Sequence, residues 1–109
     1  MLAAVLRRTE QSAIYTLSAQ LHVLFPEIVT NAAQLPSTLA LAGEGDSIAL
    51  VRAIFGRNLQ KLARGSQNDT LAFLRRRVHR DFEYGQLIMV DGWHLSQTEA
   101  RLLAFFAKQ

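Results

Sequence analysis

The residues with the clearest capacity for chemistry are four arginines and a histidine between positions 75 and 80. Large apolar residues recur around them at helical spacing, which predicts a helix with one buried side and one solvent-exposed side. The predicted buried residues are Leu71, Leu74, Val78 and Phe82. The predicted basic face consists of Arg75, Arg76, His79 and Arg80. Such a face can neutralise phosphates in a salt-dependent way or steer an acidic protein partner.

Two functions are compatible with this basic face. A helix, a turn, a basic helix over residues 69–84 and then a hairpin is the element order of a winged helix-turn-helix. Against nucleic-acid binding, Arg77 is spaced to pair with Asp81 along the helix, and Arg80 with Glu83. The overall excess of positive charge is also small, at +3. We expect a solvated face or one that meets an acidic protein partner, and nucleic acid is the alternative.

The three histidines lack the spacing of a metal site. His22, His79 and His94 fall in different predicted elements, and none has a second histidine four residues away to share a helical face. The sequence contains no cysteine, so thiolate ligands and thiol nucleophiles are excluded. We therefore expect neither a bound metal nor a cofactor.

A hydrolytic site around His94 is the nearest approach to catalysis. Asp91 and Ser96 lie close to this histidine and complete the residue types of a catalytic triad. However, Ser96 begins the pattern S-x-x-E with Glu99, which is typical of a helix cap. Neither a G-x-S-x-G elbow nor an oxyanion-binding loop is evident in the sequence. We predict that the protein is not an enzyme.

The elements that position these residues are predicted to be mostly helices. Apolar periodicity predicts helices over residues 2–24, 47–64, about 69–84 and 97–108. The helix over residues 69–84 is expected to be capped by Asn68 or Asp69, and the helix over residues 47–64 by Asp46 or Ser47. Gly65 is expected to be a left-handed C-cap between the two, and Gly85 to end the basic helix.

Shorter segments join these helices. Pro26 is expected to open a short helix through about residue 34, and residues 36–46 to form a loop. A β-hairpin is predicted at residues 87–96, because a β-prone run precedes the turn dipeptide Asp91-Gly92 and Trp93 begins a return strand. The prediction is a mainly α single domain over residues 1–109, with four to five helices and a short C-terminal β-hairpin before the last helix. No apolar run is long enough to cross a bilayer, so we expect no membrane insertion.

The final predicted helix is apolar around most of its circumference. Such a helix is either buried or lies at an interface, so we expect part of it to meet a protein partner or a second copy. The predicted partner-binding residues are Trp93, Leu102, Phe105 and Phe106. The favoured function is that of a small accessory or interaction protein, and the alternative is a winged-helix-like module that binds nucleic acid through the basic helix and hairpin.

The run D-G-W-H-L-S-Q-T-E-A-R-L from Asp91, with Asp81, Phe82 and Gly85 ahead of it, resembles a known C-terminal signature. The signature is found in small proteobacterial proteins without assigned activity, which are often exported by the twin-arginine route. The resemblance covers about residues 75–105 and implies an accessory subunit of an exported complex in the periplasm. Arg7-Arg8 is followed by polar residues, so we do not expect it to be an export signal.

Overall fold

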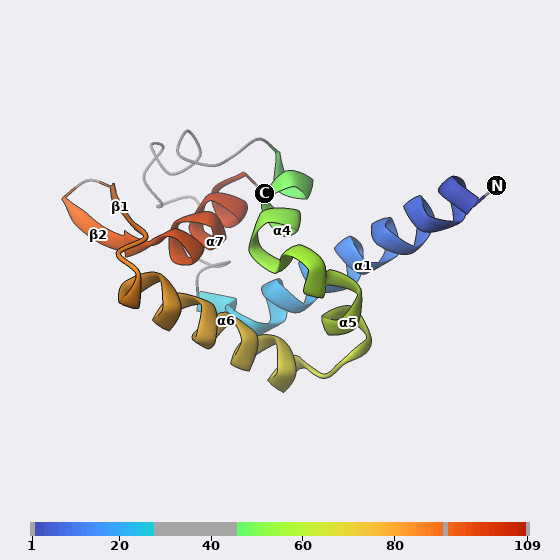
Figure 1. Ribbon diagram of the computed structural model, residues 1–109, viewed down its shortest axis with the longest axis horizontal. Coiled ribbons are helices and arrows are strands. Elements are labelled where there is room, and N and C mark those ends of the chain that lie inside the picture. Colours follow the sequence, from blue (N-terminus) through green and yellow to red (C-terminus); the bar gives the residue numbers. More distant parts are fainter. Residues whose placement is uncertain (1, 28–45, 91, 109) are drawn as a thin grey trace.

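The computed structural model describes residues 2–27, 46–90 and 92–108, without the side chains of residues 2–8, 90 and 93 (Figure 1). The described part is mainly helical, with a two-stranded antiparallel hairpin before the final helix, as the sequence predicts. Its elements are α1 (Leu2–Leu24), α4 (Ser47–Phe55), the 3-10 turn η2 (Gly56–Asn58), α5 (Leu59–Arg64), α6 (Gln67–Glu83), β1 (Leu87–Val90), β2 (Trp93–Ser96) and α7 (Gln97–Ala107). Most of the short helix expected after Pro26, and nearly all of the loop expected over residues 36–46, lie outside the described residues.

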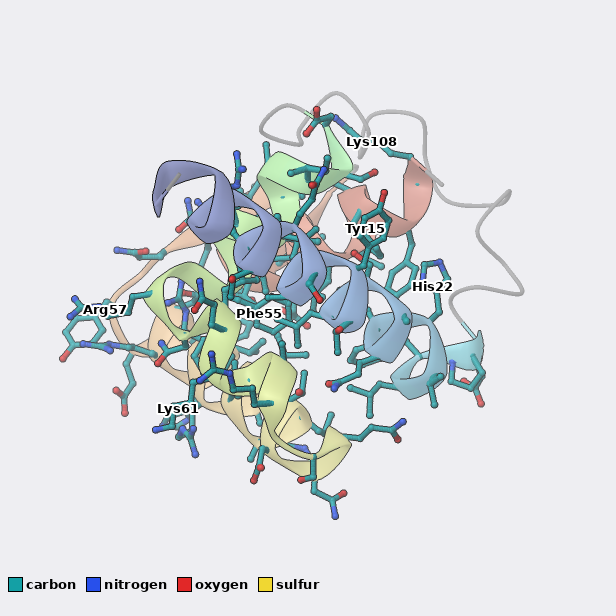
Figure 2. All side chains as sticks on the ribbon, turned by 90° about the vertical axis from the view of Figure 1, so that its right-hand side faces the viewer. Tyr15, His22, Phe55, Arg57, Lys61 and Lys108 are labelled. Carbon is teal, nitrogen blue, oxygen red and sulfur yellow. The ribbon has the colours of Figure 1, made fainter. Side chains whose placement is uncertain are left out.

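One hydrophobic core draws side chains from α1, α4, α5, α6 and α7. Helix α1 ends where the sequence predicts and contributes Leu17 and Leu21, which are both fully buried. It packs chiefly against α5, while α4 packs against α7. Phe55, at the end of α4, lies in the middle of the molecule with none of its surface exposed (Figure 2). Burial of these side chains supplies the main driving force for the fold.

The helix predicted over residues 47–64 is in fact two helices. Gly56 has a φ of 55°, a conformation that glycine adopts without steric cost, and the 3-10 turn η2 follows it. The chain therefore changes direction between α4 and α5, so that one helix faces α7 and the other faces α1. Apolar residues on both sides of the break still face the core: Val51 of α4 and Leu59 of α5 are both buried. Ile48, near the start of α4, is exposed.

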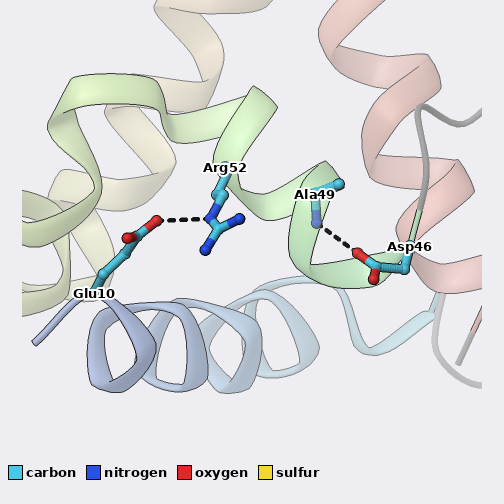
Figure 3. A network of polar contacts seen from close by, with 4 residues as sticks. All are labelled: Glu10, Asp46, Ala49 and Arg52. Atoms are coloured by element: carbon cyan, nitrogen blue, oxygen red, sulfur yellow. Dashed lines mark hydrogen bonds and ion pairs between the residues drawn. The ribbon is translucent and has the colours of Figure 1, made fainter. Parts of the chain in front are cut away.

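Helix α4 begins at the predicted cap and is linked to α1 by an ion pair. The Asp46 carboxylate accepts a hydrogen bond from the Ala49 backbone N–H at 2.8 Å (Figure 3). Arg52 Nε donates to Glu10 Oε1 at 2.6 Å, which ties α4 to α1 (Figure 3). Both side chains of this pair are substantially exposed, so it contributes little to stability.

The start of α6 differs from the sequence prediction. Ser66, rather than Asn68 or Asp69, is the N-cap: its hydroxyl accepts from the Asp69 N–H at 3.2 Å, and Asp69 Oδ2 accepts from the Ser66 N–H at 3.0 Å. Gly65 is extended, with φ −89° and ψ −169°, and is therefore not the predicted left-handed cap. A Cβ at this position would lie 2.8 Å from Asp69 Oδ2, so the glycine makes room for the capping carboxylate.

The buried side of α6 is rotated by about a quarter of a turn from the predicted one. The residues that it buries are Thr70, Phe73, Leu74 and Asp81. Of the four residues predicted to be buried, only Leu74 is, and Phe82 is 48% exposed. The reason is that Thr70 donates a hydrogen bond to Gln20 on α1 at 2.6 Å, and the Phe73 ring stacks on Phe55 at 5.7 Å between centroids.

The hairpin forms as predicted, with Leu87 opposite Ser96 and Val90 opposite Trp93. Gly92 has a φ of 83°, as the turn requires, and Gly85 has a φ of 67° where α6 ends. The predicted capping box of α7 is also confirmed, since the Ser96 hydroxyl accepts from the Glu99 N–H at 2.9 Å and Glu99 Oε1 accepts from the Ser96 N–H at 3.0 Å.

A buried carboxylate completes the N-terminus of α7. Asp81 Oδ2 accepts from the Thr98 N–H at 2.8 Å, and the Gln97 N–H donates to the Gln86 carbonyl at 3.0 Å. The Ser96 hydroxyl accepts from the Glu99 N–H. The backbone N–H groups of the first helical turn, which have no partner within the helix, therefore all have acceptors. The carboxylate also lies at the positive end of the helix dipole, where negative charge is favourable.

Helix α7 contributes one side to the core, and its other side is partly exposed. Phe105 and Phe106 are each 1% exposed and Leu102 is 7% exposed, so these predicted partner-binding residues leave almost no area for a partner. The two phenylalanine rings lie edge to face at 5.3 Å, and each is 5.6 Å from the His22 ring. Their apolar character is explained by packing within the chain, and we assign them to the core instead.

We predict that Asp81→Ala lowers the free energy of unfolding by about 1–3 kcal/mol, because it leaves the buried Thr98 N–H without an acceptor. Urea denaturation followed by circular dichroism measures the change. Asp81→Asn keeps an acceptor oxygen and should lose less. Asp46→Ala, which removes a cap from an exposed helix end, is the control; a loss from Asp81→Ala no larger than this control's would contradict the role assigned to the buried carboxylate.

Candidate functional site

Helix α6 presents two concave surfaces, one on each side of its solvent-exposed ridge. The first, which we call the apolar groove, lies mainly between α6 and α7 and has a volume of about 590 Å³. Its apolar lining residues are Phe25, Leu71, Leu74, Val78, Phe82, Leu102 and Leu103. Leu71, Val78 and Phe82 reach it because the buried side of α6 is rotated away from them. The residues that the sequence predicted as core on α6 are therefore mostly the wall of a groove.

The rim of the apolar groove carries one arginine, one histidine and one carboxylate. Arg75 and His79 line it from the α6 ridge, and Glu99 lines it from α7. Glu99 already accepts the Ser96 N–H in the capping box, whereas Arg75 and His79 are exposed side chains. His79 also meets Glu83 at 3.0 Å on the surface of α6. The groove thus combines an apolar floor with basic residues on its α6 edge and a carboxylate on its α7 edge.

The second surface, which we call the basic concavity, lies on the other side of α6. Its lining residues from α6 and the following turn are Phe73, Arg75, Arg76, Arg77, His79, Arg80, Glu83 and Tyr84, and Asn58 of η2 lies opposite them; the volume is about 650 Å³. As predicted, Arg75, Arg76, His79 and Arg80 are all exposed. Asn58, Phe73 and Arg76 also line an adjoining hollow with Lys61 and Arg64 of α5. The sequence pattern of a single helix could not reveal this second wall.

The arginines are paired differently from the prediction. The Asp81 carboxylate binds the Thr98 N–H, and Glu83 binds His79, so the predicted partners of Arg77 and Arg80 are engaged elsewhere. The Arg77 guanidinium instead lies 5.8 Å from the centre of the Phe73 ring, and the Arg80 guanidinium lies 5.9 Å from that of Tyr84. Contacts of this kind are favourable and leave the guanidinium N–H groups available to other acceptors.

The triad residue types near the hairpin are not arranged for nucleophilic catalysis. The Ser96 side chain has no exposed surface, and its hydroxyl is held by the Glu99 N–H, whereas His94 is an exposed residue of β2. Asp91 lies outside the described residues, as does the side chain of Trp93, although the backbone of Trp93 pairs with Val90 in the hairpin. A buried cap cannot act as a nucleophile in this conformation.

Searches for metal sites and membrane spans give no candidate within the described ranges. There, no group of three or more His, Asp and Glu side chains is placed to hold a metal ion. No described helix has both the length and the apolar character needed to cross a membrane.

Comparison with known proteins identifies no relative. No family model matches the sequence, and searches of curated proteins and of solved structures find no match. The function is accordingly inferred from the geometry and chemistry of the apolar groove and the basic concavity.

We predict that Phe82→Ala changes the free energy of unfolding by only about 0.5–1 kcal/mol, because half of this ring is already in contact with water. Phe73→Ala is the matched control, since it is the same substitution on the same helix at a position that is 8% exposed. It should cost about 3–5 kcal/mol. Urea denaturation of both variants measures the difference; equal losses would show that Phe82 belongs to the core.

Proposed function

We propose that the protein is a non-enzymatic interaction module that binds an acidic amphipathic helix of a protein partner in its apolar groove. The observation that carries the proposal is the exposure of Phe82 beside an apolar groove of about 590 Å³. Burial of an exposed aromatic side chain against a partner is favourable, because it removes apolar surface from water. Contiguous exposed apolar surface therefore commonly marks a binding site. Phe82 and Leu103 replace Phe105 and Phe106 as the proposed contact residues.

The length of the groove's α6 wall matches that of a short helix. Its α6 wall runs from Leu71 to Phe82, which is three helical turns and about 16 Å. An amphipathic helix of similar length would present apolar residues at i, i+4 and i+7 to such a wall, as in other helix-in-groove complexes. Aromatic anchors at the centre of such contacts contribute much of the binding energy.

The basic residues on the α6 side of the rim favour an acidic partner. Arg75 is exposed at the edge of the groove, and the carboxylate of Glu99 is already engaged by the Ser96 N–H. Acidic residues flanking the apolar stripe of a bound helix would meet Arg75, which increases the association rate and suppresses basic competitors. A role as an accessory subunit of an exported complex, which the D-G-W-x-L-S signature implies, is compatible with this mode of binding and forms the finer part of the proposal.

The test uses a synthetic peptide with leucines at i, i+4 and i+7 and glutamates on its other faces. We expect saturable binding by isothermal titration, with NMR shifts concentrated at Leu71, Val78, Phe82 and Leu103. Phe82→Glu should weaken binding at least tenfold without unfolding the protein. Tyr15→Glu is the matched control, because Tyr15 is 72% exposed on α1 and lies outside the groove.

A second peptide with lysines in place of the glutamates separates charge from apolarity. Equal binding of the two peptides, or NMR shifts away from the groove, would overturn the proposal. Light-scattering mass is measured in the same samples without peptide. A stable dimer that Phe82→Glu dissociates would place a second copy of the chain in the groove instead of a heterologous helix.

A further inference from the structure

The basic concavity carries more positive charge than the small net charge of the chain would suggest. Six Lys and Arg residues line it and the adjoining hollow, against two carboxylates. The six are Lys61, Arg64, Arg75, Arg76, Arg77 and Arg80. Because the whole chain has twelve Lys and Arg and nine Asp and Glu, the rest of the chain holds six basic and seven acidic residues. The positive charge is thus segregated onto one surface.

The two carboxylates in this surface have local partners. Asp69 Oδ2 accepts the Ser66 N–H at the start of α6, and Glu83 Oε1 binds His79. Neither is paired with an arginine in the geometry described. The guanidinium groups of Arg76, Arg77 and Arg80 therefore remain available to an anionic ligand, and a concave surface lined by one sign of charge focuses the field on it.

Aromatic rings support two of these arginines. The Arg77 guanidinium lies over Phe73, which stacks on the core residue Phe55, so this cation is positioned by the hydrophobic core itself. The Arg80 guanidinium lies over Tyr84, whose side chain is 70% exposed. A guanidinium held against a ring loses less conformational freedom when it forms hydrogen bonds. The surface is therefore partly organised for ligand binding.

From these observations we infer that the basic concavity between η2–α5 and α6 binds single-stranded nucleic acid, with arginines on the phosphates and Tyr84 as a stacking platform for a base. An exposed aromatic ring next to arginines is the combination that sequence-tolerant single-strand binding uses. A purely acidic protein segment would use the cations but has no flat π-face to stack on the tyrosine ring, whereas every base has one. The aromatic ring therefore favours nucleic acid over an acidic peptide.

This site differs from the one predicted from sequence. The predicted version paired the basic helix with the hairpin as a winged helix, whereas the second wall here consists of Asn58, Lys61 and Arg64. Arg57 of η2 is also exposed, and it lies on the same side of the molecule as Lys61 (Figure 2). The inference does not rest on the proposed function, because the apolar groove lies on the other side of the α6 ridge.

The test is fluorescence anisotropy with labelled oligo(dT) and oligo(U) over a salt series. We expect binding at low salt, and Arg76→Ala combined with Arg80→Ala should weaken it at least tenfold. The same double variant should flatten the slope of log K against log salt by about 1.4, because each single-strand phosphate contact contributes about 0.7. Arg52→Ala with Lys108→Ala removes the same charge elsewhere, since both lie outside the concavity, and should have little effect.

Tyr84→Leu tests the stacking step. We expect it to weaken oligo(dT) binding about tenfold or more, since stacking of one base on an aromatic ring contributes about 1–3 kcal/mol. Tyr15→Leu is the matched control, because Tyr15 is 72% exposed, much like Tyr84, but lies on α1 (Figure 2). Circular dichroism verifies that each variant is folded.

Three outcomes would overturn the inference. The first is no binding to either oligonucleotide at low salt. The second is equal loss of affinity from the concavity variant and its charge-matched control. The third is binding of poly-L-glutamate as tight as that of oligo(dT), with no effect of Tyr84→Leu, which would assign the surface to an acidic protein partner.

Discussion

The structure depends on the way Asp81 closes the hairpin between α6 and α7. The Asp81 carbonyl accepts from the Gln86 N–H at 2.8 Å, the Gln86 carbonyl accepts from the Gln97 N–H at 3.0 Å, and the Asp81 carboxylate accepts from the Thr98 N–H at 2.8 Å. One residue thus holds both the point where the chain leaves α6 and the point where α7 begins. A two-stranded hairpin is marginal alone, and these bonds fix its base within the fold.

This closure also sets the rotation of α6. Asp81 faces inward, where its carboxylate reaches Thr98. Phe73 and Thr70 lie on the same face of α6 as Asp81. Phe73 stacks on Phe55, and Thr70 donates a hydrogen bond to Gln20 on α1. With that face buried, Leu71, Val78 and Phe82 line the groove beside α7. Arg76 and Arg80 line the other surface, which Asn58 of η2 also lines. Both candidate surfaces are consequences of the same rotation, which polar contacts and one aromatic stack determine.

Features that depend on residues close together in the sequence were predicted correctly. The turn at Gly92, the capping box of Ser96 and Glu99, and the extent of α1 depend on residues close in sequence, and all three were predicted. The buried side of α6 was predicted wrongly, because apolar periodicity favours Phe82 and disfavours Asp81. The rotation of α6 is set by the bond of Asp81 to Thr98 and by the bond of Thr70 to Gln20 on α1. Both join residues distant in sequence, so a pattern of hydrophobicity does not reveal them.

In the candidate sites, too, features set by local sequence were predicted, and features set by distant contacts were not. The exposure of Arg76 and Arg80 follows from helical geometry and was predicted, whereas the opposite wall, with Lys61, depends on the break at Gly56 that turns α5 against α1. Phe105 and Phe106 illustrate the converse error, since an apolar helix surface has the same composition whether it packs in a core or against a partner. Their near-complete burial and their ring contacts, including those with His22 and with each other, identify the core role.

The two surfaces are physically coupled through the ridge that separates them. Arg75 and His79 line both the apolar groove and the basic concavity, so charged ligands in the two surfaces would act on the same side chains. Salt screens such interactions, with a Debye length of roughly 8 Å at physiological ionic strength. An acidic helix in the groove would lower the positive potential that attracts a phosphate backbone, and a bound strand would do the same to the helix. By linkage the two effects must be equal in free energy. A protein with both activities would therefore exchange one anionic ligand for the other rather than bridge them, and added salt would weaken the antagonism.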